Sequence, residues 1–523
     1  MFNNFKQKII YSNFRDFFIF SRLIIKKIIP IKYLWKHKFQ KQNKKEESIL
    51  LFLPSLSIDK PNFLNVGLRS FIEASKKKDI VCDLILCNAG LEICHLGGGP
   101  FNSNSKMPCK TCYKVNKSLF KDLNIIEFNN INLDHKKKLE KLSFDELKNY
   151  KYRDYELGRL VTPSIIWILR DSRLNEKHKS YFVKFINSGI KFINYIENLD
   201  IKKYSSVVLF NGVVFPESLL FEYCKKNKIQ IATFESGFNL EDKPSIEFNY
   251  NYTSKHTFTS AEDELTTNQK NMVLKRLDSF GDKAESDITN IIDEHLQNIV
   301  IFGNVSWDAS QYISSSIFNS MFEWLDELTN ILIKFPDYKY IFKTHPGENR
   351  NIKRTWYGLA EWYEKNNINK KINSEIIFSN QNINSNKLIK KSSLSLVYNS
   401  TVGMESAILG VKSMMAATTH YSYEGFVNHY DSKSEYLKNL ELILKNKDFK
   451  LSDEKIKDAT KYYYQLFNNV SYDLNKITNL TSKYEHTISS YENFLQFISE
   501  NELRNVPKNI INNKNLEKMY NLP

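Results

Sequence analysis

The sequence predicts an α/β protein made of two domains, each with a parallel β-sheet covered by helices. Its 523 residues are more than one ordinary hydrophobic core organises. Short apolar runs alternate with segments of helical periodicity along most of the chain, which is the order of βαβ units. Several runs end abruptly in small or polar residues, as buried parallel strands do at the carboxyl edge of a sheet.

The first predicted domain spans residues 48–260. Its expected elements are strands at 49–53, 80–86, 205–210 and 229–234 and helices at 64–75, 152–173, 181–198 and 215–226, with residues 115–200 mostly helical. Two of these strands end in the polar stretches Asn211-Gly212 and Glu235-Ser-Gly237. A carboxylate at a strand end can face a cleft and act as general base on a hydroxyl. Capping a helix or bonding to loop backbone is the alternative role for Glu235.

The second predicted domain, residues 298–432, carries two polar strand ends. Its expected elements are strands at 299–304, 338–343, 375–378, 394–398 and 412–416 and helices at 317–334, 355–367, 384–391 and 402–409. Lys343 and His345 close one strand, and Asn399, Ser400 and Thr401 stand between another strand and its helix. Hydroxyls and free N–H groups at a helix start suit a phosphate, to which Lys343 and His345 would add positive charge. A helix cap and a plain strand end are the alternatives, but two motifs on neighbouring strand ends favour a nucleotide site.

Charge is concentrated in the N-terminal segment, residues 1–47. The formal net charge is +15, and residues 1–45 contain twelve Lys or Arg and a single Asp. Apolar residues alternate there with cations up to Pro30, which predicts a basic amphipathic helix on an anionic membrane surface. A helix packed on the main body with solvated lysines is the alternative.

Partners and location follow from what the sequence lacks. We find no secretory signal peptide, no apolar run of 18 residues and no nucleic-acid-binding motif, so we expect a cytoplasmic protein, peripheral at the inner face of the plasma membrane, with no nucleic-acid partner. Residues 261–297 are expected to connect the domains, and residues 433–523 to form C-terminal helices and a polar tail.

Cysteines are few and four of them lie in one stretch. Cys109 and Cys112 form a Cys-x-x-Cys pair, with Cys87, Cys94 and His95 upstream. Four such ligands could hold a structural zinc ion, predicted at Cys87, Cys94, Cys109 and Cys112. A redox or loop-stapling pair and unligated buried thiols are the alternatives.

Several ordered motifs across residues 49–430 resemble the bacterial capsule polysaccharide biosynthesis proteins. They are Asn211-Gly-x-x-x-Pro-Glu217, Phe234-Glu-Ser-Gly237, Asn304-Val-Ser-Trp-Asp308, Lys343-Thr-His-Pro-Gly-Glu348, Val397-Tyr-Asn-Ser-Thr-Val-Gly-Met-Glu405 and His420-Tyr421 with Gly425-Phe426, together with Pro108-Cys-x-x-Cys112. That family is similar to GT-B glycosyltransferases, including capsule Kdo transferases. The resemblance implies two Rossmann-like domains facing across a cleft, the second holding a nucleotide sugar and the first an acceptor.

The same resemblance implies roles for individual residues. His345, Ser400 and Thr401 would bind the donor phosphate, with Lys343, Asn304, Asn399 and Glu405 near the nucleotide. Glu235 would deprotonate the acceptor, and Asn211, Gly237, His420 and Tyr421 would line the acceptor side. One departure is that Glu-Ser-Gly holds a single acid where the related polysialyltransferases have two adjacent acids.

The hypothesis is a metal-independent glycosyltransferase of surface polysaccharide synthesis. The favoured donor is a CMP-linked acidic sugar such as Kdo, with UDP- and GDP-sugars as alternatives, and the acceptor is a glycan or lipid-linked glycan. No Asp-x-Asp pair ends a strand of the second domain, so no cofactor is expected to be required for catalysis. The other candidates are a CDP-polyol phosphotransferase of the teichoic-acid type and a non-catalytic assembly subunit.

Overall fold

The chain divides into two compact units in a computed structural model. The first unit comprises Met1–Leu169, Arg173–Thr259 and Phe467–Pro523, and the second comprises Arg170–Ser172 and Ser260–Leu466. The structure describes residues 47–53, 63–94, 103–104, 107–250, 264–279, 288, 290–308, 311, 316–349, 355–381, 383–474, 478–482, 485–488, 496, 498 and 502–514. The predicted amphipathic segment lies outside these residues, so the membrane-surface helix stays a prediction.

The first unit is built on a seven-stranded sheet with the order β13-β6-β5-β4-β1-β2-β3. Its strands are β1 (Ser48–Phe52), β2 (Val81–Asn88), β3 (Asn124–Asn129), β4 (Ser206–Phe210), β5 (Ile231–Phe238), β6 (Pro244–Asn249) and β13 (Ser471–Asp473). Strands β1 to β5 are parallel, whereas β6 runs antiparallel to β5 and β13 antiparallel to β6. From β1 the chain adds β2 and β3 toward one edge of the sheet. It then crosses back to add β4 and β5 on the other side of β1, which is the doubly wound order of Rossmann-like domains.

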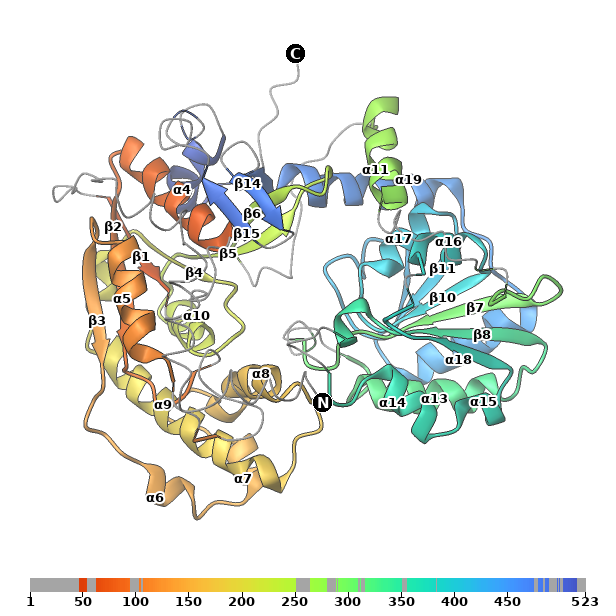
Figure 1. Ribbon diagram of the computed structural model, residues 1–523, viewed down its shortest axis with the longest axis horizontal. Helices are drawn as coiled ribbons and strands as arrows, with labels where there is room; N and C mark the ends of the chain where they lie inside the picture. The colour runs from red at the N-terminus through yellow and green to blue at the C-terminus, as the bar shows by residue number, and fades with distance from the viewer. Residues whose placement is uncertain are drawn as a thin grey trace. The chain divides into compact units, whose positions relative to one another are not determined.

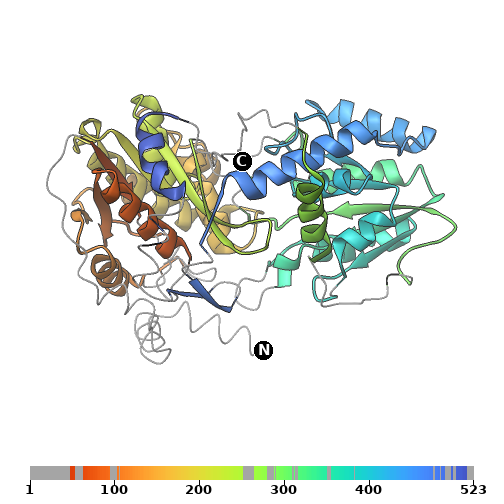
Figure 2. The same cartoon turned by 90° about the horizontal axis from the view of Figure 1, so that it is seen from above.

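Helices cover both faces of this sheet because its central strands are apolar on both sides (Figure 1). The helices are α4 (Phe63–Lys77), α5 (Cys109–Leu119), α6 (Lys136–Leu139), α7 (Phe144–Lys148), α8 (Leu157–Leu169), α9 (Lys179–Glu197), α10 (Glu217–Lys226) and α21 (Val506–Ile511). Leu51 packs with α4, α5 and α21, whereas its neighbour Phe52 packs with α8, α9 and α10 on the other face. Helix α21, near the C-terminus, lies against α4, near the N-terminus (Figure 2).

The second unit contains a six-stranded, fully parallel sheet with the order β12-β11-β10-β7-β8-β9. Its strands are β7 (Gln297–Phe302), β8 (Tyr338–Lys343), β9 (Ser374–Ile377), β10 (Leu394–Val397), β11 (Lys412–Met415) and β12 (Asn428–His429). Its helices are α11 (Thr267–Ser279), α13 (Met321–Leu332), α14 (Leu359–Lys365), α15 (Ile368–Lys371), α16 (Ser385–Lys390), α17 (Val402–Ile408), α18 (Lys433–Asn446) and α19 (Asp453–Tyr464). The predicted α/β class with two Rossmann-like domains is confirmed.

The stretch 115–200 is mostly helical, as expected, and also contains β3. Two other expectations about secondary structure were wrong. Strand β5 does not end at Phe234 but continues to Phe238 against β6. The C-terminal stretch after α19 contributes β13 to the first sheet and a hairpin of β14 (Thr478–Ser482) and β15 (Glu485–Ile488). Short strands such as β13 carry too few residues for a period-2 pattern, so only their pairing identifies them.

Residues 433–523, expected as one C-terminal segment, are therefore shared between the units. Helices α18 and α19 belong to the second unit, and residues from Phe467 onward belong to the first.

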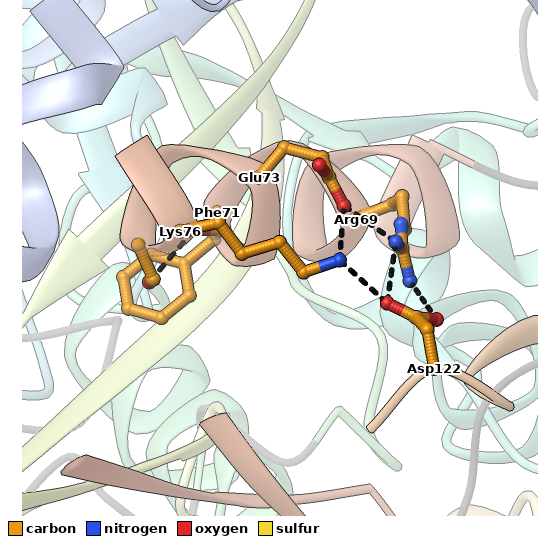
Figure 3. Close-up of polar contacts among 6 residues, drawn as sticks. Arg69, Phe71, Glu73, Lys76 and Asp122 are labelled. Atoms are coloured by element: carbon orange, nitrogen blue, oxygen red, sulfur yellow. Dashed lines mark hydrogen bonds and ion pairs between the residues drawn. The ribbon is translucent and has the colours of Figure 1, made fainter. Parts of the chain in front are cut away.

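A buried cluster of charges holds α4 to the turn before β3 (Figure 3). The Arg69 guanidinium donates to both carboxylate oxygens of Asp122, at 2.7 and 2.8 Å, and to Glu73 at 2.5 Å. Lys76 donates to the same two acids, at 2.6 Å to Asp122 and 3.0 Å to Glu73. Burial by itself raises the pKa of Asp122, but the hydrogen bonds and charges of Arg69 and Lys76 outweigh it and lower that pKa. Two cations and two anions balance, so the cluster is neutral as a unit.

We predict that Asp122→Asn lowers the free energy of unfolding by about 3 kcal/mol, because it leaves the buried Arg69 incompletely compensated. Since the folded state lowers the pKa of Asp122, its contribution is present above about pH 4 and is lost as pH falls below that value. Urea unfolding at pH 7 and at pH 3 measures both effects. Asp242→Asn, an exposed acid in the β5–β6 turn, is the control, and equal effects of the two substitutions at pH 7 would refute the prediction.

Candidate functional site

The second sheet brings three of the predicted residues to one point of its carboxyl edge. Strand β7 is central, with β8 on one side and β10 on the other, so the topological switch point lies between β7 and β10. In open α/β sheets ligands bind at this position, outside the carboxyl ends of the strands. Asn304 follows β7, Asn399 follows β10, and Lys343 is the last residue of β8.

A hydrogen bond between Asn304 and Asn399 spans the switch point. The Asn304 Nδ2 donates to the Asn399 Oδ1 at 2.6 Å, while the Asn304 Oδ1 accepts from the backbone N–H of Val305 at 2.7 Å. This network orients both amides, because the backbone donor fixes which end of Asn304 faces Asn399. The Asn399 Nδ2 is consequently turned away from Asn304, and it is buried without a hydrogen-bond partner in the described residues.

Lys343 supplies a positive charge at the same edge. Its side chain is 5% exposed, and in the described part of the chain its amine forms no hydrogen bond or ion pair. Burial alone lowers the pKa of Lys343 to about 8, so the ammonium form still predominates at neutral pH. A buried cation without a partner among the described residues is costly. It lies at the same carboxyl edge of the sheet as the unsatisfied Asn399 amide, and both features favour an anion there.

His345 is held in one tautomer by its own loop. The backbone N–H of Gly347 donates to the His345 Nδ1 at 2.9 Å, so Nδ1 is an acceptor and the neutral ring carries its proton on Nε2. Glu348 follows in the same turn, where burial raises the pKa of its carboxyl to about 8. His345 can therefore act as a neutral donor, and Glu348 adds no full negative charge at neutral pH.

A buried tyrosine, Tyr421, holds the loop that follows β10. The Tyr421 hydroxyl donates to the backbone carbonyl of Ser400, and the Ser400 Oγ accepts from the N–H of Val402 at 3.4 Å. The Thr401 hydroxyl donates to Glu405 at 3.2 Å. Burial raises the pKa of Glu405, which the Thr401 hydroxyl partly offsets. The loop conformation is thus fixed by contacts that leave Ser400 half-buried and Thr401 exposed.

Tyr421 and His420 have packing roles in this structure. Tyr421 is fully buried, and sequence reasoning did not identify it as the support of Ser400. The His420 ring stacks on Tyr462, with centroids 5.7 Å apart, and its Nδ1 lies 2.9 Å from the Tyr462 hydroxyl. Both residues thereby anchor the loop after β11, and their place on the acceptor side stays a prediction.

In the first unit the structure brings Asn211 and Glu235 together. The Asn211 Nδ2 donates to the Glu235 Oε2 at 3.2 Å, as expected for neighbouring strand ends. Because β5 continues past Glu235 and pairs with β6, a second acid, Glu247, lies directly opposite Glu235. Sequence reasoning missed Glu247, although the alternation of polar and apolar residues around Ile246 and Phe248 is a period-2 signal for β6.

The four predicted zinc ligands lie near one another. Burial raises the pKa of Cys112 well above its ordinary value, and the nearby thiols of Cys94, Cys87 and Cys109 raise it further. None of the six cysteines, all of which are described, forms a disulfide. Within the described ranges no group of three or more His, Cys, Asp or Glu is arranged to hold a metal ion, and His95 lies outside them. The zinc site stays a prediction.

Comparisons with known proteins give weak similarities only. No family model and no curated protein sequence matches the chain. A beta Kdo 2,7 transferase, KpsC of Thermosulfurimonas dismutans, is 13% identical with TM-score 0.32, covering 56% of this chain and 84% of that one. A glycosyltransferase from Rickettsia africae ESF-5 is 13% identical with TM-score 0.29, covering 90% and 100%. UDP-GlcNAc 2-epimerase of Neisseria meningitidis is 12% identical with TM-score 0.25, covering 81% and 96%.

Similarities of this size establish neither a family nor an activity. Among the helices that the structure describes, none combines the length and apolarity needed to cross a membrane.

We predict that Lys343→Met stabilises the protein at pH 7 by about 1–3 kcal/mol, because it removes a buried charge that has no partner. The folded state lowers the pKa of Lys343 from 10.5 to about 8, so the penalty is fully present below pH 8 and fades as pH rises toward 10.5. Urea unfolding between pH 7 and 10 should show that the free energy of unfolding of the wild type rises with pH, whereas that of Lys343→Met depends less on pH. Lys339→Met, on the same strand but ion-paired with Glu375 at 3.6 Å, is the control; a destabilised Lys343→Met would refute the prediction.

Proposed function

We propose that this protein is a glycosyltransferase of bacterial surface polysaccharide synthesis and that the carboxyl edge of its second sheet binds the phosphate of a nucleotide-activated sugar. The observation that carries the proposal is the Asn304–Asn399 hydrogen bond at the switch point, on the same carboxyl edge of the sheet as the buried Lys343. The favoured donor is a CMP-linked acidic sugar such as Kdo, and the acceptor is a glycan or a lipid-linked glycan.

The chemistry of sugar transfer requires stabilisation of the leaving phosphate. Negative charge develops on the phosphate oxygens as the bond to the sugar breaks, and fixed donors aimed at that charge lower the barrier. Lys343 would supply a full positive charge, and the Asn399 Nδ2 and the His345 Nε2–H would supply neutral donors. Ser400 and Thr401 would add hydroxyls, and Glu405 would lie near the nucleotide. These groups need no metal ion, and no step of the proposal depends on the cysteines.

The acceptor would be activated by the first unit. Glu235 is half-buried on β5, and its Oε2 accepts from the Asn211 Nδ2. We propose that this carboxylate accepts the proton of the attacking hydroxyl, with Asn211 fixing its orientation. Gly237, two residues further on the same face of β5, would lie on the acceptor side.

Two other functions use the same residues. A CDP-polyol phosphotransferase would place a nucleotide diphosphate at Lys343 and His345, and its products would contain a phosphodiester. A non-catalytic assembly subunit would keep both folds without binding nucleotide. Membrane association through residues 1–45 stays a prediction in each case.

We predict that CMP, and a CMP-sugar more tightly, binds the purified full-length protein in isothermal titration calorimetry at pH 7. His345→Ala should weaken binding about tenfold, whereas His345→Gln should retain part of it, because the glutamine amide can place a donor near the position of Nε2–H. Asn399→Asp should weaken binding more strongly, since it replaces an unsatisfied donor by an anion. CDP, UDP and GDP titrations test the choice of nucleotide, and the absence of binding by all four would refute the proposal.

The affinity should also depend on pH. Because the pKa of Lys343 is about 8, nucleotide affinity should be constant near pH 7 and fall by up to tenfold per unit above pH 8. Lys343→Met should bind weakly at every pH, whereas Lys339→Met should retain the wild-type profile. A wild-type profile that is flat to pH 10 would remove Lys343 from the site.

We predict that Glu235→Gln leaves nucleotide affinity unchanged and lowers the rate of sugar transfer by at least about 10²-fold, because it removes the proposed base without altering the size of the side chain. A donor screen with radiolabelled nucleotide sugars and glycan acceptors measures the rate. Asp242→Asn in the β5–β6 turn is the matched control. A fully active Glu235→Gln would assign the base to another residue.

A further inference from the structure

We infer that the polar face of β5, β6 and β13 is a binding site for an uncharged, hydroxyl-rich ligand, and that Glu247 contacts this ligand together with Glu235. The inference deepens the proposed function, on which it rests for its biological meaning, by naming the class of acceptor. Its physical basis is independent of that function and lies in the first unit alone.

At this edge of the sheet, β5, β6 and β13 have one apolar face and one polar face. On one face Phe234, Ile246, Phe248 and Tyr472 pack into the hydrophobic core with α4 and α21. On the other face the register places Glu247 between Glu235 on β5 and Ser471 on β13, because directly paired residues share a face.

The next pairs along the same face are polar as well. Ser245 pairs with Gly237 on β5 and with Asp473 on β13. Ser245 and Ser471 are fully buried, whereas Glu235, Glu247 and Asp473 are half-buried. A solvated outer face would leave its serines exposed, so buried serines beneath half-exposed acids are typical of a constructed polar site.

Glu247 is held in place over Gly237. The Ser471 hydroxyl donates to the Glu247 Oε1 at 3.1 Å. A Cβ atom at position 237 would collide with this carboxylate and would lie 3.3 Å from the Ser245 Oγ. Glycine at 237 therefore makes room for the Glu247 carboxylate, which lies against the β5 backbone close to the Ser245 hydroxyl.

The Ser245 hydroxyl is the observation that points to a ligand. It is buried and has no hydrogen-bond partner among the described residues. An unsatisfied buried hydroxyl costs about 1–3 kcal/mol, and a ligand oxygen within reach of the Ser245 hydroxyl would recover part of that cost. The Glu235 and Glu247 carboxylates would accept hydrogen bonds from further ligand hydroxyls, and Asn211 would keep Glu235 oriented.

The charge of the face selects among ligands. Glu235, Glu247 and Asp473 disfavour a phosphate or carboxylate at this position, because like charges repel at short distance. A metal ion is the other ligand that acids attract, but the described acids form no group of three or more arranged to hold one. The site therefore favours a neutral saccharide end over an acidic one.

Saturation-transfer-difference NMR on the full-length protein tests the inference with defined probes. The probes are the methyl glycosides of glucose, galactose and N-acetylglucosamine, with methyl glucuronide and methyl sialoside as acidic counterparts. We expect signals from at least one neutral glycoside and weaker or no signals from the acidic ones. No signal from any neutral glycoside, or stronger signals from the acidic ones, would overturn the inference.

Variants assign the signals to this face. Glu247→Gln should weaken glycoside binding about tenfold, whereas Asp242→Asn in the neighbouring turn should not change it. Ser245→Ala should weaken binding without lowering the melting temperature, because it removes a hydroxyl that has no hydrogen-bond partner in the described part of the chain. Glycoside binding that is unchanged in both Glu247→Gln and Ser245→Ala would overturn the inference. A melting temperature that CaCl₂ raises in the wild type but not in Glu247→Gln would also overturn it, because the face would then bind a metal ion.

The same preparations separate this inference from the proposed function. Glu247→Gln should bind CMP as the wild type does, since the nucleotide site lies in the second unit. If CMP binds and no glycoside does, only the inference fails. If a glycoside binds through Glu247 and no nucleotide binds, the proposed transferase fails and the saccharide site stands.

Discussion

The hydrogen bond between Asn304 and Asn399 is the contact on which the candidate nucleotide site depends. In a doubly wound sheet the chain leaves the strands on either side of the switch point in opposite directions, so their two loops separate and leave a gap. Here the gap is spanned by one amide pair whose orientation the Val305 N–H fixes. Because both loops are tied, the remaining donor of Asn399 has a defined position before any ligand arrives, which is the condition for electrostatic preorganisation.

The charged and polar groups around this contact favour a bound anion, and the buried Lys343 lowers the free energy of unfolding. Lys343 is buried without a partner among the described residues, His345 accepts the Gly347 N–H at its Nδ1, and Glu348 is held near neutrality by burial. Such an arrangement is unfavourable in the empty protein, and sites of this kind commonly trade stability for function. The neutral Arg69 cluster in the first unit is the contrasting case, in which every buried charge meets an opposite one.

The sheet of the first unit differs from that of the second at one edge, where it carries acidic residues on one face. Its parallel strands are apolar on both faces, but the two antiparallel strands at its edge are apolar on one face only. This change lets Glu235 and Glu247 lie side by side without sacrificing the core, which Phe234 and Ile246 continue on the opposite face. The Glu-Ser-Gly motif holds a single acid where polysialyltransferases have two adjacent acids. In the folded protein a second acid, Glu247, comes from a neighbouring strand.

The sequence by itself determined the alternation of strands and helices, the two-domain organisation and the strand ends at Lys343 and Asn399, because these follow from local apolar periodicity and from polar residues that interrupt it. It also placed Asn211 and Glu235 next to neighbouring strands, but it ended β5 before Glu235, whereas the strand continues to Phe238. Only the tertiary structure decided the tautomer of His345, the burial of Lys343 and Tyr421, and the pairing of Glu235 with Glu247. The physical reason is that burial and hydrogen-bond partners are set by residues distant in the chain: Ser471 reaches Glu247 across more than two hundred positions, and no local pattern records that contact.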